Sequence, residues 1–184
     1  MKKFRMPPGF RFSPSDTELL YYLKMKAKGM SFRPWNDVIL EKNLYAENAA
    51  PWMLFNNDDP WQVTSKVDAA VGKIYEEKVL YVVTKLVKIG SNKTMRSVGP
   101  STWDSATGKY KVWNSQGQVM GFKKILNLRR KGMEVMSNWM MHAYHISGVL
   151  LQEVKDNDYV ICRIKWDYSR NIWVLIKKFK KVVD

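Results

Sequence analysis

Basic and aromatic side chains recur at close spacing in the second half of the chain, and they are the residues best suited to chemistry with an anionic partner. Lys109, Lys111 and Trp113 alternate, so on a β-strand they share one face while Tyr110 and Val112 take the other. A strand that presents two ammonium groups beside a ring suits the major groove of duplex DNA, which admits a β-ribbon as well as a helix. Further cations surround this segment in the sequence: Lys85, Lys88, Lys93, Arg96, Lys123, Lys124, Arg129, Arg130 and Lys131. This pattern indicates a surface that binds phosphates.

The charge balance of the whole chain also favours an anionic partner. Lysine and arginine number 31 against 17 aspartate and glutamate residues, which gives a formal net charge of +14. Such an excess repels itself in a folded protein and is usually tolerated because a polyanion relieves it. Nucleic acid, an anionic membrane surface and an acidic protein are the candidate partners. A solvated basic surface is the alternative that requires no partner.

Residues that could support catalysis or metal binding are few and poorly placed. His142 and His145 are three positions apart on an expected strand, so they face opposite ways and cannot share one metal ion. Cys162 is the single cysteine, which excludes an intramolecular disulfide and favours a reducing compartment. Residues Ala106–Lys109 are similar to part of a phosphate-binding loop, but Trp103 stands where that loop needs glycine. We therefore expect no enzyme activity, no metal, no cofactor and no small-molecule substrate.

Length and composition predict one domain with a short extension. With 184 residues, of which 46% are hydrophobic, the chain can bury a sizeable core. We assign residues 1–166 to the domain and residues 167–184 to a basic C-terminal extension, in which Ile172–Phe179 is a candidate extra strand. The start of the chain lacks the apolar segment of a signal peptide, and no stretch approaches 18 apolar residues, so we expect no membrane partner. The basic cluster Lys177–Lys181 is typical of a nuclear-import patch or a solvated tail.

The elements that must position the basic residues are one clear helix and a series of strands. Ser15 and Glu18 have the spacing of a capping box and Gly29 ends the apolar periodicity, which predicts a helix over residues 15–28. Val38–Leu44 fits a short helix or a strand. Alternating or β-branched segments predict further strands at residues 78–87, 109–113, 119–128, 138–146 and 159–166, with a hairpin turn at 114–118 and a mobile polar loop at 90–97. A helix followed by a run of antiparallel strands predicts an α+β fold.

Four sequence blocks occur in order over residues 7–165. Pro7–Leu19 is P-P-G-F-R-F-S-P-S-D-T-E-L, Trp103–Lys109 is W-D-S-A-T-G-K, Asn138–Tyr144 is N-W-M-M-H-A-Y, and Asp158–Ile164 is D-Y-V-I-C-R-I. They are similar to P-P-G-F-R-F-x-P-T-D-E-E-L, W-K-A-T-G-K, W-x-M-H-E-Y and D-W-V-L-C-R-I, the motifs of the NAC-domain transcription factors of plants. The resemblance covers nearly the whole chain.

The resemblance implies a fold with a twisted antiparallel β-sheet packed between a few helices. It also implies a nuclear protein that works as a homodimer or as a heterodimer with related NAC proteins. In that family an arginine of the opening block pairs with a glutamate of the following helix in the other subunit, and these positions match Arg11 and Glu18. The family inserts the sheet edge that carries its W-x-A-T-G motif into the major groove of double-stranded DNA at sites with a CGT core. The residues that match this edge or flank it are Trp103, Ala106, Thr107, Gly108, Lys109 and Lys111, with Lys88, Lys93 and Arg96 before them. Lys123, Lys124, Arg129 and Arg130 are expected to add phosphate contacts.

Two departures from the family motifs leave a second hypothesis open. Asp104–Ser105 replaces a single lysine, and the extra residue predicts a bulge or a register shift while the acid would repel phosphates. Gly132–Val135 replaces a longer, more basic stretch. The first hypothesis is a sequence-specific DNA-binding domain that acts in transcription. The alternative is an interaction module that still dimerises with related transcription factors but has lost specific DNA reading.

Overall fold

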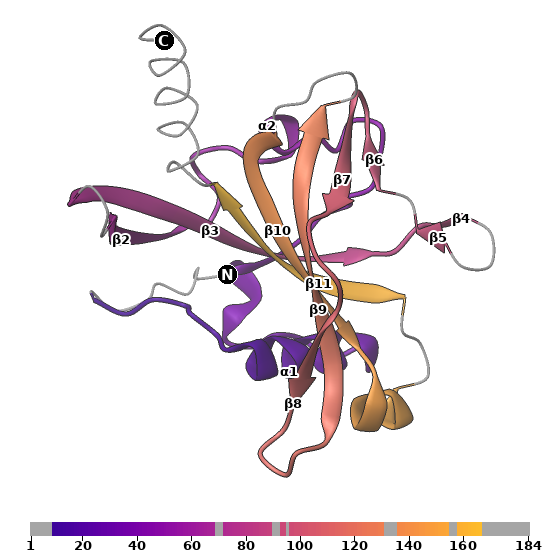
Figure 1. Cartoon of the computed structure of the whole chain (residues 1–184). Coiled ribbons are helices and arrows are strands. Elements are labelled where there is room, and N and C mark those ends of the chain that lie inside the picture. Colours follow the sequence, from indigo (N-terminus) through magenta and orange to yellow (C-terminus); the bar gives the residue numbers. More distant parts are fainter. Residues whose placement is uncertain are drawn as a thin grey trace, which may run out of the picture.

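The computed structural model describes residues 9–68, 72–89, 93–94, 96–130, 136–154 and 158–166. The extension 167–184, with its candidate strand at Ile172–Phe179, lies outside these residues, as do residues 90–92 and 95 of the expected polar loop. Helix α1 (Asp16–Ala27) lies on one side of a curled sheet and the single turn α2 (Pro51–Leu54) lies on the other (Figure 1). Two 3-10 turns, η1 (Trp35–Asp37) and η2 (Gly148–Glu153), complete the helical elements of the described chain.

Local sequence sets both ends of helix α1. The Ser15 hydroxyl accepts the Glu18 N–H at 3.2 Å, and the Glu18 carboxylate accepts the Ser15 N–H at 2.7 Å. These two bonds satisfy backbone donors that the first helical turn would otherwise leave free. Gly29 adopts φ +73° after the helix, a left-handed conformation that glycine takes without steric cost. The helix predicted over residues 15–28 is confirmed.

The described strands form one sheet of nine strands and a separate two-stranded ribbon. The main sheet has the order β1-β3-β11-β10-β9-β7-β6, with β2 paired to β3 and β8 paired to β9; β4 and β5 form the ribbon. The strands are β1 (Ile39–Glu41), β2 (Gln62–Asp68), β3 (Lys73–Lys85), β4 (Lys88–Ile89), β5 (Lys93–Thr94), β6 (Ser97–Val98), β7 (Ser101–Ser105), β8 (Tyr110–Trp113), β9 (Val119–Arg130), β10 (Met136–Ile146) and β11 (Tyr159–Trp166).

The α+β fold and the hairpin at residues 109–128 are confirmed, but the sheet differs from the expectation in several respects. Lys93–Thr94 and Ser97–Val98 form the short strands β5 and β6 within residues 90–97, which were expected to be a polar loop. The short segment at 38–44 forms strand β1, and it pairs with β3 in parallel, Ile39 opposite Tyr81, so the sheet is mixed rather than wholly antiparallel. The β2–β3 hairpin, which projects from the body in Figure 1, had no strong sequence signal at β2 because that strand is mostly polar.

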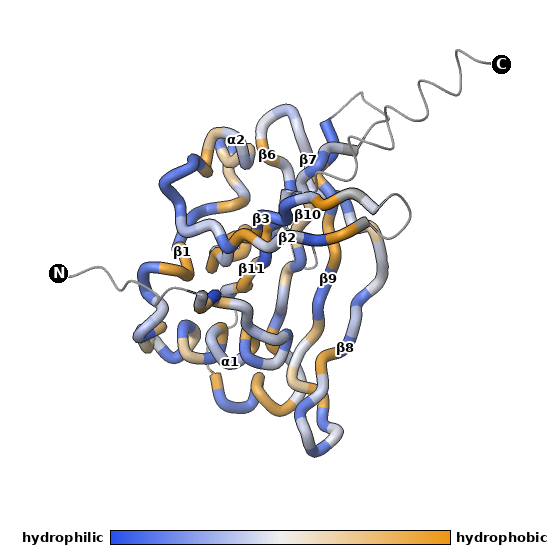
Figure 2. Tube along the Cα trace, turned by 90° about the vertical axis from the view of Figure 1, so that its left-hand side faces the viewer, coloured by the Kyte–Doolittle hydropathy of each residue, from blue (hydrophilic) through white to orange (hydrophobic). Residues whose placement is uncertain are grey.

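Each face of the sheet buries its own apolar cluster. Leu19, Leu20 and Leu23 of α1 are fully buried against one face, which we call the α1 face. Burying a leucine side chain contributes roughly 1.5–3 kcal/mol, so these three residues anchor the helix to the sheet. Trp103 and Phe55 belong to the cluster on the opposite face, below α2. Figure 2 shows the apolar parts of β3 and β11 lying between α1 and α2.

Candidate nucleic-acid interface

The sheet edge formed by β7 and β8 is interrupted at the A-T-G tripeptide. Both strands pair antiparallel with β9; the last β7 pair is Ser105–Leu126 and the first β8 pair is Tyr110–Lys123. Residues 106–109 therefore face only two residues of β9 and leave the ladder as a bulge. All four are exposed. This agrees with the bulge expected from the extra residue after Trp103.

A few hydrogen bonds hold the bulge to the sheet. The Ala106 N–H donates to the Ile125 carbonyl at 3.0 Å, and the Ser105 hydroxyl donates to the Thr107 carbonyl at 2.8 Å. The Thr107 hydroxyl has only a long contact of 3.4 Å with the Gly108 carbonyl, so it is available to an outside partner. A Cβ atom at Gly108 would meet nothing within 4 Å, which means that the fold itself does not need glycine there. Its absence of a side chain leaves room for a partner to approach the backbone.

Cations gather beside the bulge on the face opposite α1. The Lys109 and Lys124 ammonium groups lie 4.8 Å and 5.7 Å from the centroid of the Phe122 ring. That ring stacks on His145 at a centroid distance of 4.7 Å and an interplanar angle of 12°. The Lys111 ammonium lies 5.7 Å from the ring centroid of Trp113, which is itself 51% exposed. On β8, Lys111 and Trp113 share one face with Val112 buried on the other, as expected, whereas Lys109 precedes the strand and its ammonium still lies over Phe122.

The protonation behaviour of this cluster reflects crowding of positive charge. The pKa of Lys124 lies below its ordinary value because of partial burial and then because of the charges of Arg96 and Lys109. Burial lowers the pKa of His145 to about 3, with further lowering by Lys124 and Arg96, so the imidazole is neutral near pH 7. Like charges held this close favour an anion between them. Within the described part of the chain, Arg96, Lys109, Lys111 and Lys124 form no ion pair with an acid.

Trp103 does not share this exposed surface. Its side chain is 1% exposed and packs in the apolar cluster on the α2 side, opposite Leu128 of β9. A ring so enclosed cannot reach a base or a phosphate in this fold. The expected direct contact between Trp103 and DNA is therefore corrected: the residue anchors β7, and thereby the start of the bulge, to the core.

Two cations expected to contact phosphates are engaged within the protein. Lys123 lies on the α1 face, where its ammonium is 2.6 Å from Asp16 of the helix. Arg129 forms an ion pair with Asp104 at 2.5 Å. Adjacent residues of a strand face opposite ways, which is why Lys123 and Lys124 are separated by the sheet. Lys123 therefore holds helix α1 to the sheet and is not placed to contact phosphates. Arg129 is half-exposed and neutralises Asp104, the acid that replaces a lysine of the family motif.

The remaining cations occupy different positions around this edge. Lys88 is exposed at the start of β4 and pairs with Asp158 at 2.5 Å. Arg96 precedes β6, and its carbonyl accepts the Trp103 N–H at 3.0 Å. Arg130 is exposed at the end of β9, while Lys93 belongs to β5 and its side chain is outside the described set. Lys131 lies outside the described residues.

Arg11 and Glu18, the expected dimer contacts, lie beside each other on the α1 side. Both are exposed and both line one surface cavity of about 200 Å³ with Tyr22 and Trp35. Hydrogen bonds from the Ser15 backbone and hydroxyl keep the pKa of Glu18 below its ordinary value. The carboxylate therefore serves the capping box and stays charged at the surface.

Phe122 and His145 were not singled out from the sequence as part of the interface. The signal that could have found Phe122 is its alternation with Lys124 on β9, since residues two apart share a face. His145 could not be placed without the pairing of β10 with β9, in which it lies opposite Phe122. The two histidines do face opposite sides of β10, as expected, and Cys162 is buried in the core.

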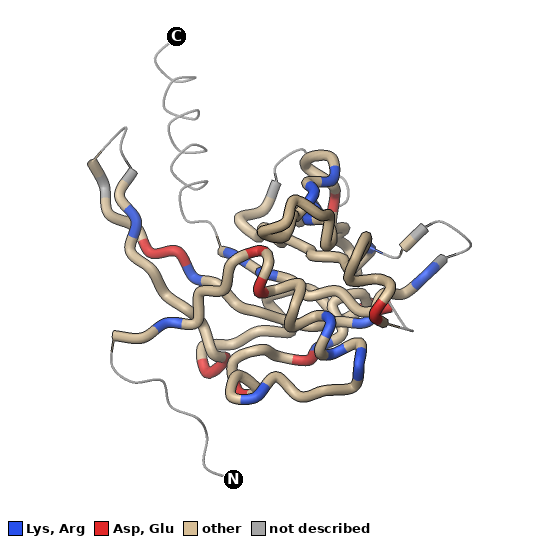
Figure 3. The backbone as a smooth tube through the Cα atoms, turned by 90° about the horizontal axis from the view of Figure 1, so that it is seen from below, with Lys and Arg blue, Asp and Glu red and all other residues tan. Residues whose placement is uncertain are grey.

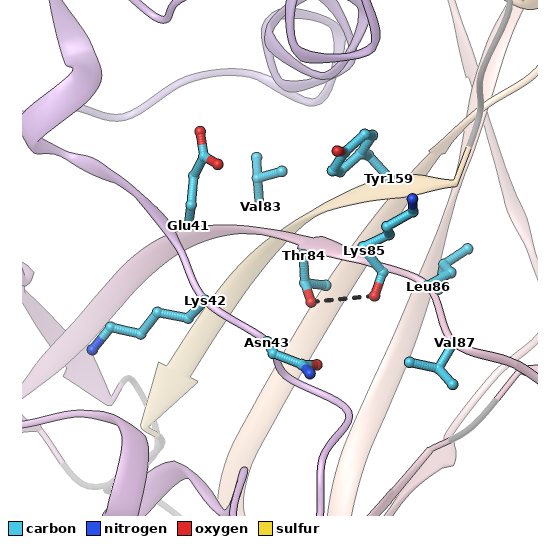
Figure 4. Close-up of a pocket in the computed structure, with 9 residues that line it drawn as sticks. All are labelled: Glu41, Lys42, Asn43, Val83, Thr84, Lys85, Leu86, Val87 and Tyr159. Atoms are coloured by element: carbon cyan, nitrogen blue, oxygen red, sulfur yellow. Dashed lines mark hydrogen bonds between the residues drawn. The ribbon is translucent and has the colours of Figure 1, made fainter. Parts of the chain in front are cut away.

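A cavity of about 410 Å³ near the end of β3 offers a different kind of site (Figure 4). The Lys42 side chain points away from it and bonds the Leu54 carbonyl at 2.6 Å, while the Lys85 ammonium lies 5.9 Å from the Tyr159 ring centroid. The Thr84 hydroxyl accepts the Leu44 N–H at 3.1 Å and has a longer contact of 3.5 Å with the Lys85 carbonyl. These groups do not converge on one point, so the sheet edge is the better candidate. No helix of the described chain is both long and apolar enough to cross a membrane.

Comparison with known proteins shows the family to which the chain belongs. The family model described as "No apical meristem (NAM) protein" matches residues 7–146. The chain is 32% identical over 178 residues to the NAC domain-containing protein JA2L of Solanum lycopersicum, a match that covers 93% of this chain and 44% of JA2L. It is 34% identical over 176 residues to the NAC domain-containing protein JA2 of the same organism, a match that covers 90% of this chain and 43% of JA2. It is 30% identical over 162 residues to NAC domain-containing protein 30 of Arabidopsis thaliana, a match that covers 86% of this chain and 45% of that protein. The chain thus spans less than half the length of these relatives. It belongs to the NAC domain family of plant transcription regulators.

Proposed function

We propose that this domain binds double-stranded DNA as a dimer, by placing the β7–β8 edge in the major groove, and acts in transcription regulation in the nucleus. The observation that carries the proposal is the exposed bulge at residues 106–109, flanked by cations that have no acidic partner among the described residues. A narrow edge of a sheet fits the major groove, and an uncompensated positive cluster is drawn to phosphates.

The bulge and the cluster have different roles in this proposal. Lys109, Lys111, Lys124 and Arg96 contact phosphates and set the position of the domain, because ammonium and guanidinium groups bind backbone oxygens of any sequence. Thr107 and the low backbone around Gly108 approach the base edges, since a threonine offers a hydroxyl to polar groups and a methyl to thymine. The resemblance to the family motif leads us to expect preference for sites with a CGT core.

The acid in the W-D-S-A-T-G-K block does not oppose this function. Asp104 lies on β7, and its carboxylate is neutralised by Arg129. The pair contributes little net charge near the phosphates, so DNA affinity rests on the four cations of the cluster. Arg130 at the end of β9 is free to add a phosphate contact.

The proposed dimer joins the α1 sides of two copies, with Arg11 of each copy pairing with Glu18 of the other. Both side chains are exposed and Glu18 remains ionised, which such a pair requires. The same surface could join this chain to a related NAC protein. A dimer presents two reading edges, and binding of the first half-site raises the effective concentration at the second.

Fluorescence anisotropy with two labelled duplexes of equal length, one carrying a CGT site and one scrambled, tests the function. We expect tighter binding to the CGT duplex at physiological salt, and a Thr107→Ala variant should narrow the difference between the two duplexes. Thr102→Ala, a half-buried position on β7, is the matched control that should leave the difference unchanged. Equal affinity of the unmodified chain for both duplexes would favour the alternative, an interaction module without specific reading.

A further inference from the structure

Ser13 lies in an exposed stretch of chain directly before helix α1. Residues 10–15 form neither helix nor strand, Ser13 is exposed, and the following Pro14 is buried. Ser13–Pro14 is the one place in the sequence where serine or threonine precedes proline. Proline also restricts the residue before it to extended backbone, which is the conformation that proline-directed protein kinases bind.

The surroundings of Ser13 are unusually rich in cations. Arg11, Arg163 and Lys165 line the same cavity as Ser13, which has a volume of about 110 Å³. The Arg163 guanidinium donates to the Pro14 carbonyl at 2.7 Å, so this charge lies next to the peptide bond between Pro14 and Ser15, one residue after Ser13. The Nε atom of Arg163 is buried and has no hydrogen-bond partner. These groups supply donors that a phosphate could use.

The acids near this cavity are already compensated. Glu77 also lines it, and its carboxylate is held by Lys165 at 3.0 Å and by Lys66 at 2.9 Å. Figure 3 shows acidic and basic residues beside one another on this projecting β2–β3 hairpin. Asp16 accepts from Lys123 and Tyr144 and forms a longer ion pair of 3.9 Å with Arg163, and Glu18 accepts from the Ser15 backbone. Three cations against one lining carboxylate leave a net positive cavity.

We propose that Ser13 is a phosphorylation site for a proline-directed kinase, that its phosphate occupies the cavity of Arg11, Arg163 and Lys165, and that this modification weakens the dimer. In the reaction, the Ser13 hydroxyl oxygen attacks the γ-phosphorus of ATP. The new Oγ–P bond replaces the bond between the γ-phosphorus and the β,γ-bridging oxygen, ADP leaves, and the hydroxyl proton passes to the kinase. The phosphate then lies just before the N-terminus of the twelve-residue helix α1, whose dipole favours negative charge.

The effect on association rests on the proposed dimer. Arg11 would pair with Glu18 of the other copy in that dimer, whereas a phosphate on Ser13 draws the Arg11 guanidinium to its own chain. It also adds a charge of about −1.5 to −2 beside Glu18 in each copy. Both effects oppose the pairing of two copies, so modification of the monomer shifts the equilibrium away from the dimer. It therefore also weakens binding to DNA sites that must contact the β7–β8 edges of both copies.

The phosphate cavity is tested on the full chain with phosphoserine incorporated at position 13, and at exposed Ser31 as the control. The phosphorus chemical shift is followed by NMR as a function of pH. A phosphate held by arginine and lysine should titrate about 1 pKa unit lower than the one at position 31, because nearby cations favour the dianion. Arg11→Gln should remove part of this difference. Identical titration at the two positions would overturn the cavity assignment.

The kinase and dimer parts have their own readouts. Treatment of the unmodified chain with a proline-directed kinase and ATP should add one phosphate, located at Ser13 by mass spectrometry and lost in Ser13→Ala; no incorporation would overturn the site. Analytical ultracentrifugation should show a dimer dissociation constant at least about tenfold higher for the Ser13 phosphoprotein than for the Ser31 control. An unchanged constant would overturn the regulatory role. If the unmodified chain does not dimerise, the proposed dimer and its regulation both fail, while the NMR titration still decides the cavity.

Discussion

Removing the cluster beside the bulge should change how DNA binding depends on salt. The variant carries Lys109→Gln, Lys111→Gln and Lys124→Gln, three cations that have no acidic partner among the described residues. Glutamine keeps two of the four methylene groups of each lysine and removes the ammonium groups that lie over the Phe122 ring, but Lys109 and Lys111 are exposed and Lys124 is only half-buried. The change therefore removes charge with little effect on the fold.

The magnitude follows from counterion release. Each phosphate contact contributes about 0.9 to the slope of log affinity against log salt concentration, so three lost contacts lower that slope by about 3. When salt rises from ~50 to ~200 mM, the factor by which affinity falls should be roughly 40 times smaller for the variant than for the unmodified chain. At low salt the variant should bind more weakly. The assay is fluorescence anisotropy on a CGT duplex at several salt concentrations.

The matched control carries the same loss of charge on the other face of the sheet. Lys24 and Lys26 of α1 and Lys28 at its C-terminal end are partly exposed and pair with Glu153 or Glu41 at the surface. Changing all three to glutamine lowers net charge equally but leaves the β7–β8 edge intact, so the salt slope should stay close to that of the unmodified chain. If the cluster variant and this control give the same slope, the reasoning about the edge is refuted.

Three further predictions concern the framework that holds the edge. Trp103→Ala should destabilise the domain by about 3–5 kcal/mol in urea unfolding, because it empties a core site; a variant of normal stability that only binds DNA less well would contradict the burial of this ring. Burial works to raise the pKa of Asp16, but hydrogen bonds from Lys123 and Tyr144 outweigh it, and the pKa lies below 3.8 in the folded protein. The stability that this group contributes is therefore present above pH 3.8 and is lost as the pH falls through the lower folded-state pKa. Asp16→Asn should flatten that part of the curve of unfolding free energy against pH, and an unchanged curve would argue against the two hydrogen bonds. Gly121→Ala should destabilise the fold, measured by thermal unfolding, since a Cβ there would lie 2.3 Å from the His145 carbonyl oxygen and 2.8 Å from Leu20; a neutral effect would mean that β9 and β10 are not so close.

The sequence was a good guide where local rules decide structure. The capping box of Ser15 and Glu18 and the left-handed Gly29 act within a few residues, so both ends of α1 could be predicted. The hairpin at residues 109–128 is likewise local, and Gly117 adopts φ +74° in its turn. The alternation of Lys111 and Trp113 on β8 followed from strand geometry alone.

Long-range pairing decided what the sequence could not. Lys123 and Lys124 look alike in the sequence, yet one bonds Asp16, 107 residues earlier, and the other faces the opposite side of the sheet. Trp103 stands inside a motif linked to DNA, but its burial depends on the partners that β9 and the α2 side supply. The Asp104–Arg129 pair likewise joins two strands, so its neutralising effect could not be inferred from the motif.

The central claim is that the bulge at residues 106–109 and its flanking lysines meet DNA. Backbone amide NMR spectra of the labelled chain, recorded with and without a CGT duplex, test it most directly. The account predicts that the largest shift changes fall on residues 106–111 and on Lys124, with small changes along α1. Large changes on α1 combined with unmoved signals at residues 106–111 would contradict it.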